Sequence, residues 1–218
     1  PRVRCVACDV IGELSLESSH GPMFQMEYYA TVIPLLQNCL SDQTSARVQA
    51  RGAAAFITFL ECCDDVYVAP YLDGLLQILF ERLQHGKRTV QEQAVTALAS
   101  VAECCARSFG FEEPEDEEDA QEKEQRKNNS PLIKYYSVIM PVLKQILTSC
   151  NKKEERLFQA RALECATLFG DAMPKEAYLA DAQQLMQFMH HQQQAGLDFD
   201  HPLRSYMLQA YTRIGRCL

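Results

Sequence analysis

The 218-residue sequence lacks the marks of several large classes of protein. No apolar run approaches the roughly 18 residues of a membrane span, and no secretory signal peptide is recognisable, so we expect no membrane partner. Alternation of apolar and polar residues with period two never persists, so strand signals are weak. A Gly-rich phosphate loop is missing, and the five histidines are scattered without a nucleophile at a recognisable spacing. We therefore predict that the chain is not an enzyme and needs no cofactor.

The sequence also lacks an excess of basic residues. It has 21 Lys and Arg against 29 Asp and Glu, which gives a net charge of −8. Residues 112–124 hold nine acids and one base, whereas the rest of the chain has 20 acids and 20 bases. Binding to nucleic acid relies on basic residues that displace phosphate counterions, so we expect no direct nucleic-acid partner. The acidity belongs to one segment.

Ten cysteines are present, but they are not arranged as a disulfide framework or a metal site. Several of them fall in apolar, helix-like stretches: Cys5 and Cys8, Cys62 and Cys63, and Cys104 and Cys105. Buried free thiols act as small hydrophobic side chains, which favours a reducing, intracellular compartment. Cys5-x-x-Cys8 has no second ligand pair at the spacing of a zinc site, so we predict no metal.

What the sequence does contain is an internal repeat. Five segments begin with an apolar residue followed by Gln or Arg: Val3-Arg4, Val48-Gln49, Val90-Gln91, Phe158-Gln159 and Leu203-Arg204. These starts are 45, 42, 68 and 45 residues apart, and the long interval contains the acidic segment. Without about two dozen residues of that segment, the period matches that of HEAT repeats, about 40–47 residues.

Each repeat contains two predicted helices. In the first helix apolar residues recur three and four positions apart, and the second helix is rich in small residues. Pro34 and Pro141 fall at the same place inside first helices, where a proline bends a helix. The pattern predicts nine helices, at about 2–18, 22–40, 45–62, 66–84, 88–108, 131–149, 153–170, 174–194 and 202–217.

These helices predict an all-α fold, a single HEAT-repeat α-solenoid over residues 1–218 in which antiparallel helix pairs stack as a right-handed superhelix. It has about four and a half repeats. They are a half repeat at 1–18 and helix pairs at 22–63, 65–108, 131–170 and 174–217. Residues 111–130 are predicted to be an acidic, disordered inter-repeat insertion, because their polar composition cannot build a core. A transient helix over Asp119–Lys127 is the alternative for part of it.

Several runs of the sequence resemble the beta-karyopherin nuclear transport receptors of the importin-beta superfamily. They are RVRCVACDVIGEL (2–14), RVQARGAAAFITFLE (47–61), PYLDGLLQ (70–77), VQEQAVTALASVAE (90–103), RALECATLFG (161–170) and DFDHPLRSYMLQAYTRIGRCL (198–218). They are most similar to the importin five branch, also called karyopherin beta three. The resemblance covers nearly the whole chain except the acidic insertion. Because the first residue is Pro1, we expect an internal fragment of middle repeats.

The resemblance implies a non-enzymatic nuclear import receptor that works in a Ran-GTP-regulated transport cycle. Such receptors shuttle between cytoplasm and nucleus through the nuclear pore. They bind basic cargo, such as ribosomal proteins and histones, through Lys-rich localisation signals on the concave face formed by the second helices. Ran GTPase and nucleoporins would bind through the full-length receptor.

A ladder of acids is the candidate cargo-binding site. Counting thirteen residues on from Val48, Val90 and Phe158 reaches Glu61, Glu103 and Asp171, and the count from Val3 ends one residue before Glu17. Each acid stands near the C-terminal end of a second helix, where the helix dipole disfavours an anion. A cationic ligand explains this placement better than helix stability does. Glu17, Glu61 and Glu103 resemble the family's signal-recognition positions, whereas the family has an apolar residue at the position of Asp171.

Other polar residues have two interpretations each. Glu92 and Glu164 are candidate neighbours on the cargo-binding face, or else surface charges. The acids of the ladder are alternatively solvated helix ends. Gln49, Gln91 and Gln159 recur in register, and we predict that they hydrogen-bond between repeats. The acidic insertion either acts electrostatically on basic cargo or is a solvated spacer.

A HEAT-repeat scaffold or adaptor, similar to a phosphatase regulatory subunit, is the alternative function, because fold does not determine function. The two functions differ in the ligand they take. A transport receptor prefers exposed basic peptides on its inner face, whereas a scaffold binds folded partner domains.

Overall fold

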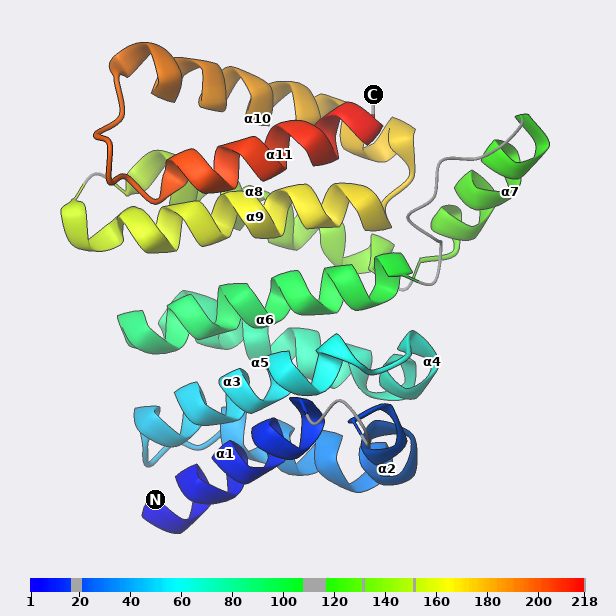
Figure 1. Cartoon of the computed structure of the whole chain (residues 1–218), viewed down its shortest axis with the longest axis vertical. Helices are drawn as coiled ribbons and strands as arrows, with labels where there is room; N and C mark the ends of the chain where they lie inside the picture. The colour runs from blue at the N-terminus through cyan, green and yellow to red at the C-terminus, as the bar shows by residue number, and fades with distance from the viewer. Residues whose placement is uncertain (17–20, 108–116, 131, 151, 218) are drawn as a thin grey trace. The chain divides into compact units, whose positions relative to one another are not determined.

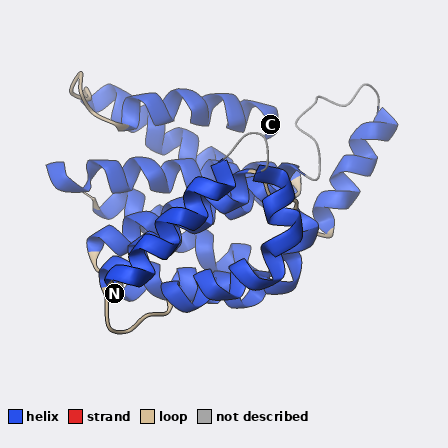
Figure 2. Ribbon diagram, turned by 60° about the horizontal axis from the view of Figure 1, so that its bottom comes forward, coloured by secondary structure: helices blue, strands red, loops and turns tan. Residues whose placement is uncertain are grey.

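The structure is a computed structural model that describes residues 1–16, 21–107, 117–130, 132–150 and 152–217. The described residues are largely helical and contain no strand (Figure 1; Figure 2). The chain forms two compact units, residues 1–104 and 105–218, and the boundary between them falls inside a helix.

The first unit carries helices α1 (Arg2–Leu16), α2 (Gly21–Leu40), α3 (Ala46–Glu61), α4 (Asp65–Val68), α5 (Leu72–His85) and most of α6 (Arg88–Arg107). First helix α2 packs against second helix α3, and α3 packs against α1, the second helix of the preceding half repeat (Figure 1). Fully buried side chains such as Leu36 of α2, Phe56 of α3 and Leu75 of α5 lie in the core of this unit. This is the arrangement of HEAT repeats.

Small residues allow α2 and α3 to approach closely. Gly52 of α3 is buried, and a Cβ atom at that position would lie 2.8 Å from Cβ of Cys39 on α2. A real Cβ does not tolerate that distance, so the close approach of the two helices requires glycine here. Ala53 and Ala55 are buried beside it, as the predicted small-residue face of the second helix requires.

The second unit repeats the pattern. It contains α7 (Glu117–Asn128), α8 (Ile133–Ser149), α9 (Arg156–Ala172), α10 (Lys175–Ala195) and α11 (Leu203–Cys217). First helix α8 packs on second helix α9, and α9 lies beside α11, the second helix of the next repeat (Figure 1). Leu143, Leu163 and Phe169 are fully buried between these helices.

One predicted helix is interrupted. Residues 66–84 were predicted as a single helix, but a 3-10 turn, Ala69–Tyr71, separates α4 from α5. Pro70 lies in that turn, and a proline cannot donate the backbone hydrogen bond that a continuous helix needs there. Pro34 and Pro141, by contrast, lie inside α2 and α8, as predicted.

Part of the acidic insertion is a regular helix. Helix α7 covers Glu117–Asn128, where a disordered insertion was predicted, and residues 111–116 of the insertion lie outside the described residues. Ala, Glu, Gln, Lys and Arg, all good helix formers, make up most of α7. A salt bridge of 2.6 Å joins Glu122 to Arg126 one turn later. Local propensity therefore outweighs the lack of apolar residues in this segment.

The recurring glutamines hold each repeat together rather than joining neighbouring repeats. The side-chain amide of Gln49 donates to the carbonyl oxygen of Asp42, that of Gln91 to Leu83, and that of Gln159 to Leu147. Each acceptor lies in the last turn of the first helix of the same repeat or just after it, where carbonyl groups lack helical partners. The prediction of hydrogen bonds between repeats was wrong. A glutamine at the start of the second helix reaches back across the turn.

Candidate functional site

Two of the predicted acids lie exposed near the C-terminal ends of second helices. Glu61 is the last residue of α3, and Glu103 lies one turn before the end of α6. These helix ends are in contact, because the thiol of Cys104 donates a hydrogen bond to the carbonyl oxygen of Cys63 over 3.3 Å. The first unit therefore carries the two carboxylates on neighbouring helix ends.

Neither carboxylate is neutralised by the part of the chain that the structure describes. No salt bridge to Glu61 or Glu103 is found among those residues. Each anion near the negative end of a helix dipole costs about 0.3–1 kcal/mol, and packed helices are about 8–10 Å apart. A Lys or Arg side chain bound between the two helix ends would offset both the dipole penalty and the mutual repulsion.

A buried glutamine fixes the helix ends behind these positions. The Gln25 side-chain amide of α2 donates to the carbonyl oxygens of Ser15 and Phe59, at 3.4 and 3.3 Å. These acceptors belong to α1 and α3, and each lies two residues before a ladder acid, Glu17 or Glu61. Sequence reasoning missed Gln25. Its place on the apolar face of α2, one turn before Tyr29, was the available signal.

Glu17, the first acid of the predicted ladder, lies outside the described residues. The described part of the chain stops at Leu16, the last residue of α1, and resumes at Gly21. Its role stays a prediction.

Asp171 differs from the other acids because it is engaged within the fold. It lies in the last turn of α9, and its side chain is only 11% exposed. Its Oδ2 is 3.2 Å from Nη2 of Arg216 on α11, and its Oδ1 is 3.9 Å from Sγ of Cys217. Burial raises the pKa of Asp171 above its ordinary value, against the opposing effect of Arg216, Arg213 and Lys127.

The partner of Asp171 was also detectable from the sequence. Arg216 stands thirteen residues after Leu203, which is the same register position in the next repeat. The ladder position therefore changes sign from acid to base between these two repeats. Extending the thirteen-residue count by one repeat would have identified the pair.

Glu92 and Glu164 are half-buried and lie further from the helix ends. Glu92 precedes Glu103 by eleven residues in α6, so the two share a face about 16 Å apart along the helix axis. Glu164 precedes Asp171 by seven residues in α9, again on the same face, about 10 Å away. Both lie along the helix face that carries the ladder positions, and their part in cargo binding stays a prediction.

The described residues give no indication of a metal centre or a membrane span. They contain no group of three or more His, Cys, Asp and Glu side chains that could hold a metal ion. Among the helices described, none is long and apolar enough to cross a membrane. The ten cysteines carry free thiols, and Cys63 and Cys104 are buried where the two helix ends meet.

Comparison with known proteins identifies similar chains among the importins. No protein-family profile matches the sequence. The chain is 34% identical over its whole length to importin subunit beta-3 of Saccharomyces cerevisiae and spans 18% of that relative. It is 33% identical over 84 residues, 38% of the chain and 8% of the relative, to a probable importin-5 homolog of Dictyostelium discoideum.

Solved structures agree with this similarity. The chain superposes on the crystal structure of Kap121p with a TM-score of 0.78 at 33% identity, covering 100% of this chain and 18% of Kap121p. Structures of Kap121p bound to Pho4p and to Nup53p match over the same shares with TM-scores of 0.77 at 32% identity. In a Kap121p mutant that matches at 0.78 and 33%, with the same coverage, two aspartates and a glutamate are replaced by lysine. Those acids are spaced about one HEAT repeat apart, about 40–47 residues.

Proposed function

Because the chain belongs to the importin-beta family of karyopherins, in its beta-3 branch, we propose that it forms part of a nuclear import receptor. In this proposal Glu61 and Glu103 bind the basic side chains of a Lys-rich localisation signal. The chain contributes no catalysis. Its task is to bind cargo while the receptor crosses the nuclear pore.

One observation carries the proposal. Glu61 and Glu103 are exposed at helix ends held together by the bond from Cys104 to Cys63, and no described residue neutralises them. Alternate side chains of an extended peptide recur about every 6.5–7 Å, so a peptide can present lysines to acids on neighbouring helices. The spacing of Glu61 and Glu103 by one repeat also parallels the acids that are replaced by lysine in the Kap121p mutant.

The remaining predicted acids have graded roles in this proposal. Glu17 extends the ladder by one repeat towards the N-terminus, and Glu92 and Glu164 flank it and attract additional basic residues. Asp171 contributes least, because its carboxylate is paired with Arg216. The affinity for a basic peptide then resides mainly in Glu61 and Glu103.

The cargo and the transport cycle follow from the relatives by analogy. Kap121p forms complexes with Pho4p and with Nup53p. We propose that the whole receptor to which this chain belongs likewise takes basic cargo, such as ribosomal proteins or histones, and contacts nucleoporins. Ran-GTP would regulate release of the cargo, and the receptor would shuttle between cytoplasm and nucleus.

The test is the affinity of the 218-residue chain for a fluorescent Lys-rich peptide, measured by anisotropy at low and high salt. We expect the variant Glu61→Lys/Glu103→Lys to lose binding, because it replaces two attractive charges with two repulsive ones. Salt should weaken wild-type binding, since exposed charges are screened. The matched control is Glu27→Lys/Asp73→Lys, which makes the same change in net charge on the exposed surface of first helices α2 and α5.

The control variant distinguishes specific binding at Glu61 and Glu103 from a response of the peptide to the net charge of the whole chain. A site at the ladder requires the control variant to bind as the wild type does. Equal loss in both variants would mean that the peptide responds only to net charge. Unchanged binding in both, or no binding of the peptide by the wild type, would contradict the proposed site and favour a scaffold that binds folded partner domains.

A further inference from the structure

Three basic side chains gather around one carboxylate in the second unit. Arg213 and Arg216 stand one turn apart near the C-terminal end of α11, and Asp171 lies in the last turn of α9. These two helices pack side by side with their C-terminal ends together (Figure 1). Lys127, in the last turn of α7, is the third base. We call Lys127, Arg213 and Arg216 the basic cluster. With Asp171 included, three bases and one acid give it a net charge of +2.

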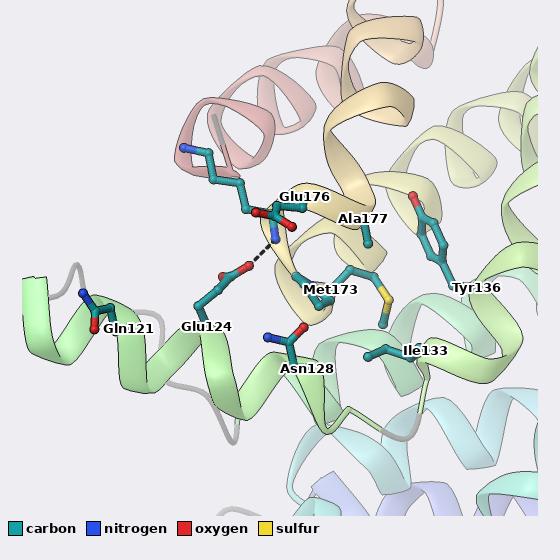
Figure 3. Close-up of a pocket in the computed structure, with 10 residues that line it drawn as sticks. Gln121, Glu124, Asn128, Ile133, Tyr136, Met173, Glu176 and Ala177 are labelled. Atoms are coloured by element: carbon teal, nitrogen blue, oxygen red, sulfur yellow. Dashed lines mark hydrogen bonds between the residues drawn. The ribbon is translucent and has the colours of Figure 1, made fainter.

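A contact of α7 with the start of α10 brings Lys127 to this place. Oε1 of Glu124 accepts a hydrogen bond from the backbone N–H of Lys175, the first residue of α10, over 2.5 Å (Figure 3). The N-cap residue, Pro174, forms no side-chain hydrogen bond, so Glu124 supplies the cap of α10. Lys127 follows Glu124 by three residues and so lies on the same side of α7, whereas Asp171 precedes Lys175 by four residues. The ammonium group of Lys127 and the carboxylate of Asp171 are therefore neighbours.

The electrostatics of Asp171 agree with this placement. Burial raises the pKa of Asp171, and Arg216, Arg213 and Lys127 act in the opposite direction. All three bases are thus close enough to act on the same carboxylate. Only Arg216 is paired with it, because Nη2 of Arg216 and Oδ2 of Asp171 are 3.2 Å apart.

Arg213 and Lys127 have no counter-ion among the residues that the structure describes. Neither of them forms a salt bridge there, and both are half-buried. Nη1 of Arg213 is shielded from solvent and has no hydrogen-bond acceptor within the described part of the chain. A buried charged donor without an acceptor is costly, so the basic cluster favours an additional anion.

Helix stability explains only part of the basic cluster. A base in the last turn of a helix interacts favourably with the negative end of the helix dipole, which accounts for Lys127 and Arg216. Arg213 is the base in excess, because it lies one turn earlier and its Nη1 is unsatisfied. Helix α11 contains three arginines and no acid, so it offers no carboxylate of its own to Arg213.

The charge balance indicates which anion fits. Each helix C-terminus carries roughly −0.5 elementary charge, so the ends of α7, α9 and α11 lower the net charge at the cluster to about +0.5. A carboxylate, with one negative charge, matches this excess more closely than a phosphate group, which carries about −1.5 to −2. A carboxylate also fits the planar edge of a guanidinium group.

We propose that the basic cluster binds an acidic side chain, Asp or Glu, from a linear segment of a protein partner. The carboxylate of that side chain accepts hydrogen bonds from the guanidinium group of Arg213 and lies against the ammonium group of Lys127. The site takes the opposite charge from the one proposed at Glu61 and Glu103 and lies in the other unit, so each proposal can fail without the other.

The probes are three peptides that differ at one position only. The first carries a single glutamate at the centre of a Gly-Ser sequence with blocked ends, the second has glutamine there, and the third has phosphoserine. Each is titrated into the 218-residue chain and followed by NMR, which detects weak binding. We expect the glutamate peptide to bind at least about tenfold more tightly than the glutamine peptide, the effect of one charge-assisted hydrogen bond. The phosphoserine peptide should bind no more tightly than the glutamate peptide.

Two pairs of variants locate the binding site. Arg213→Gln should abolish the preference for glutamate over glutamine. Arg204→Gln makes the same change in net charge at an exposed position of α11, where Arg204 lies over the ring of Phe199, and should leave the preference intact. Lys127→Gln should weaken the preference, whereas Arg126→Gln, at an exposed position of the same helix, should not. Circular dichroism establishes that all four variants keep the helical fold.

Backbone amide resonances of the unmodified chain give a readout that does not depend on the variants. Signals of residues 213–217 should shift on addition of the glutamate peptide, whereas those of residues 203–207, in the first turns of the same helix, should not. Equal affinities of the glutamate and glutamine peptides, unmoved signals at residues 213–217, or equal effects of Arg213→Gln and Arg204→Gln would each overturn the site. Tighter binding of the phosphoserine peptide than of the glutamate peptide would overturn a carboxylate as its ligand.

Discussion

Arg216 and Asp171 occupy the same position in two consecutive repeats and form a salt bridge, with Nη2 and Oδ2 3.2 Å apart. The carboxylate is largely buried, and the guanidinium is about one-third exposed. This pair uses within the fold a position that in the first unit carries the exposed acids Glu61 and Glu103. The same register position can thus carry either a largely buried, paired acid or an exposed one, and Arg216 follows Asp171 in the next repeat whereas Glu103 follows Glu61.

The pair predicts an asymmetric response to mutation. We expect Arg216→Met to lower the free energy of unfolding by about 1–2 kcal/mol, because it leaves the Asp171 carboxylate half-satisfied in a buried place. Asp171→Asn should cost less, because burial already raises the pKa of Asp171 and so disfavours its charged form. Urea unfolding of both single variants and the Asp171→Asn/Arg216→Met double variant measures the coupling. Additive effects of the two substitutions would contradict a direct interaction.

The hydrogen bonds of Gln159 at the end of a first helix predict that losing them lowers the free energy of unfolding. The Gln159 amide donates to the carbonyl oxygens of Leu147 and Cys150 over 2.7 and 3.3 Å and is nearly inaccessible to solvent. Gln159→Met keeps the volume but leaves these acceptors without the donor, so we expect a loss of about 1–3 kcal/mol in unfolding free energy. Gln145→Met, at an exposed position of α8, is the control and should change stability by less than about 0.5 kcal/mol. Similar losses of unfolding free energy in both variants would show that the buried hydrogen bonds of Gln159 do not stabilise the fold.

Periodicity predicted the helices of the repeats, although a 3-10 turn interrupts one of them, and it did not predict α7 as a regular helix. Apolar spacing in each first helix and small residues such as Gly52 in each second helix are local patterns, and the helices follow them. The break at Pro70 was missed although proline in a helix is a local signal, because the same residue type is tolerated inside α2 and α8. Context, rather than residue type, decides whether a proline interrupts a helix.

Local sequence patterns could not predict the contacts between residues that are far apart in the sequence. The bond from Glu124 to the start of α10 spans 51 residues, and no spacing rule links its two ends. The direction of the Gln159 amide, back into its own repeat, depends on which carbonyls the first helix leaves unpaired. The register count did place Glu61 and Glu103 at helix ends, because that count is itself a property of the repeat.

The carboxylate of Glu124 on α7 accepts a hydrogen bond from the Lys175 N–H at the start of α10. Removing this carboxylate should loosen the contact between the two helices. We expect Glu124→Gln to increase hydrogen exchange at the Lys175 amide and to cost about 1 kcal/mol, because a neutral amide interacts less favourably with the helix N-terminus. Glu122→Gln, which alters an exposed pair with Arg126 on the same helix, is the matched control and should leave the Lys175 amide unchanged. Exchange measured by NMR distinguishes them, and equal exchange rates in both variants would contradict the cap.

Two glycines predict opposite effects of the same substitution. Gly52→Ala should destabilise the chain by about 1–3 kcal/mol, since the new Cβ would press on Cys39 where α2 and α3 are closest. Gly215→Ala in α11 should stabilise it by about 0.5–1 kcal/mol, because no atom lies within 4 Å of the added Cβ and alanine favours the helix. Thermal unfolding of the two variants measures the difference, and effects of equal sign would contradict the close approach of α2 and α3.

Acid should weaken the first unit through Asp42. Its side chain is 1% exposed, and hydrogen bonds from the Thr44 hydroxyl and N–H, at 2.6 and 2.7 Å, together with Arg4, hold the pKa of Asp42 below its ordinary value. A lowered pKa in the folded state means that this stabilisation is complete above the unfolded pKa, about 4, and is lost as the pH falls through the folded pKa.

In melting curves between about pH 7 and 2, the difference in melting temperature between wild type and Asp42→Asn should therefore shrink towards low pH. Thr44→Val removes the hydroxyl that donates to Asp42. The acid transition of this variant should therefore lie at a higher pH than that of the wild type. A constant difference between wild type and Asp42→Asn across this range would mean that ionised Asp42 does not stabilise the turn after α2.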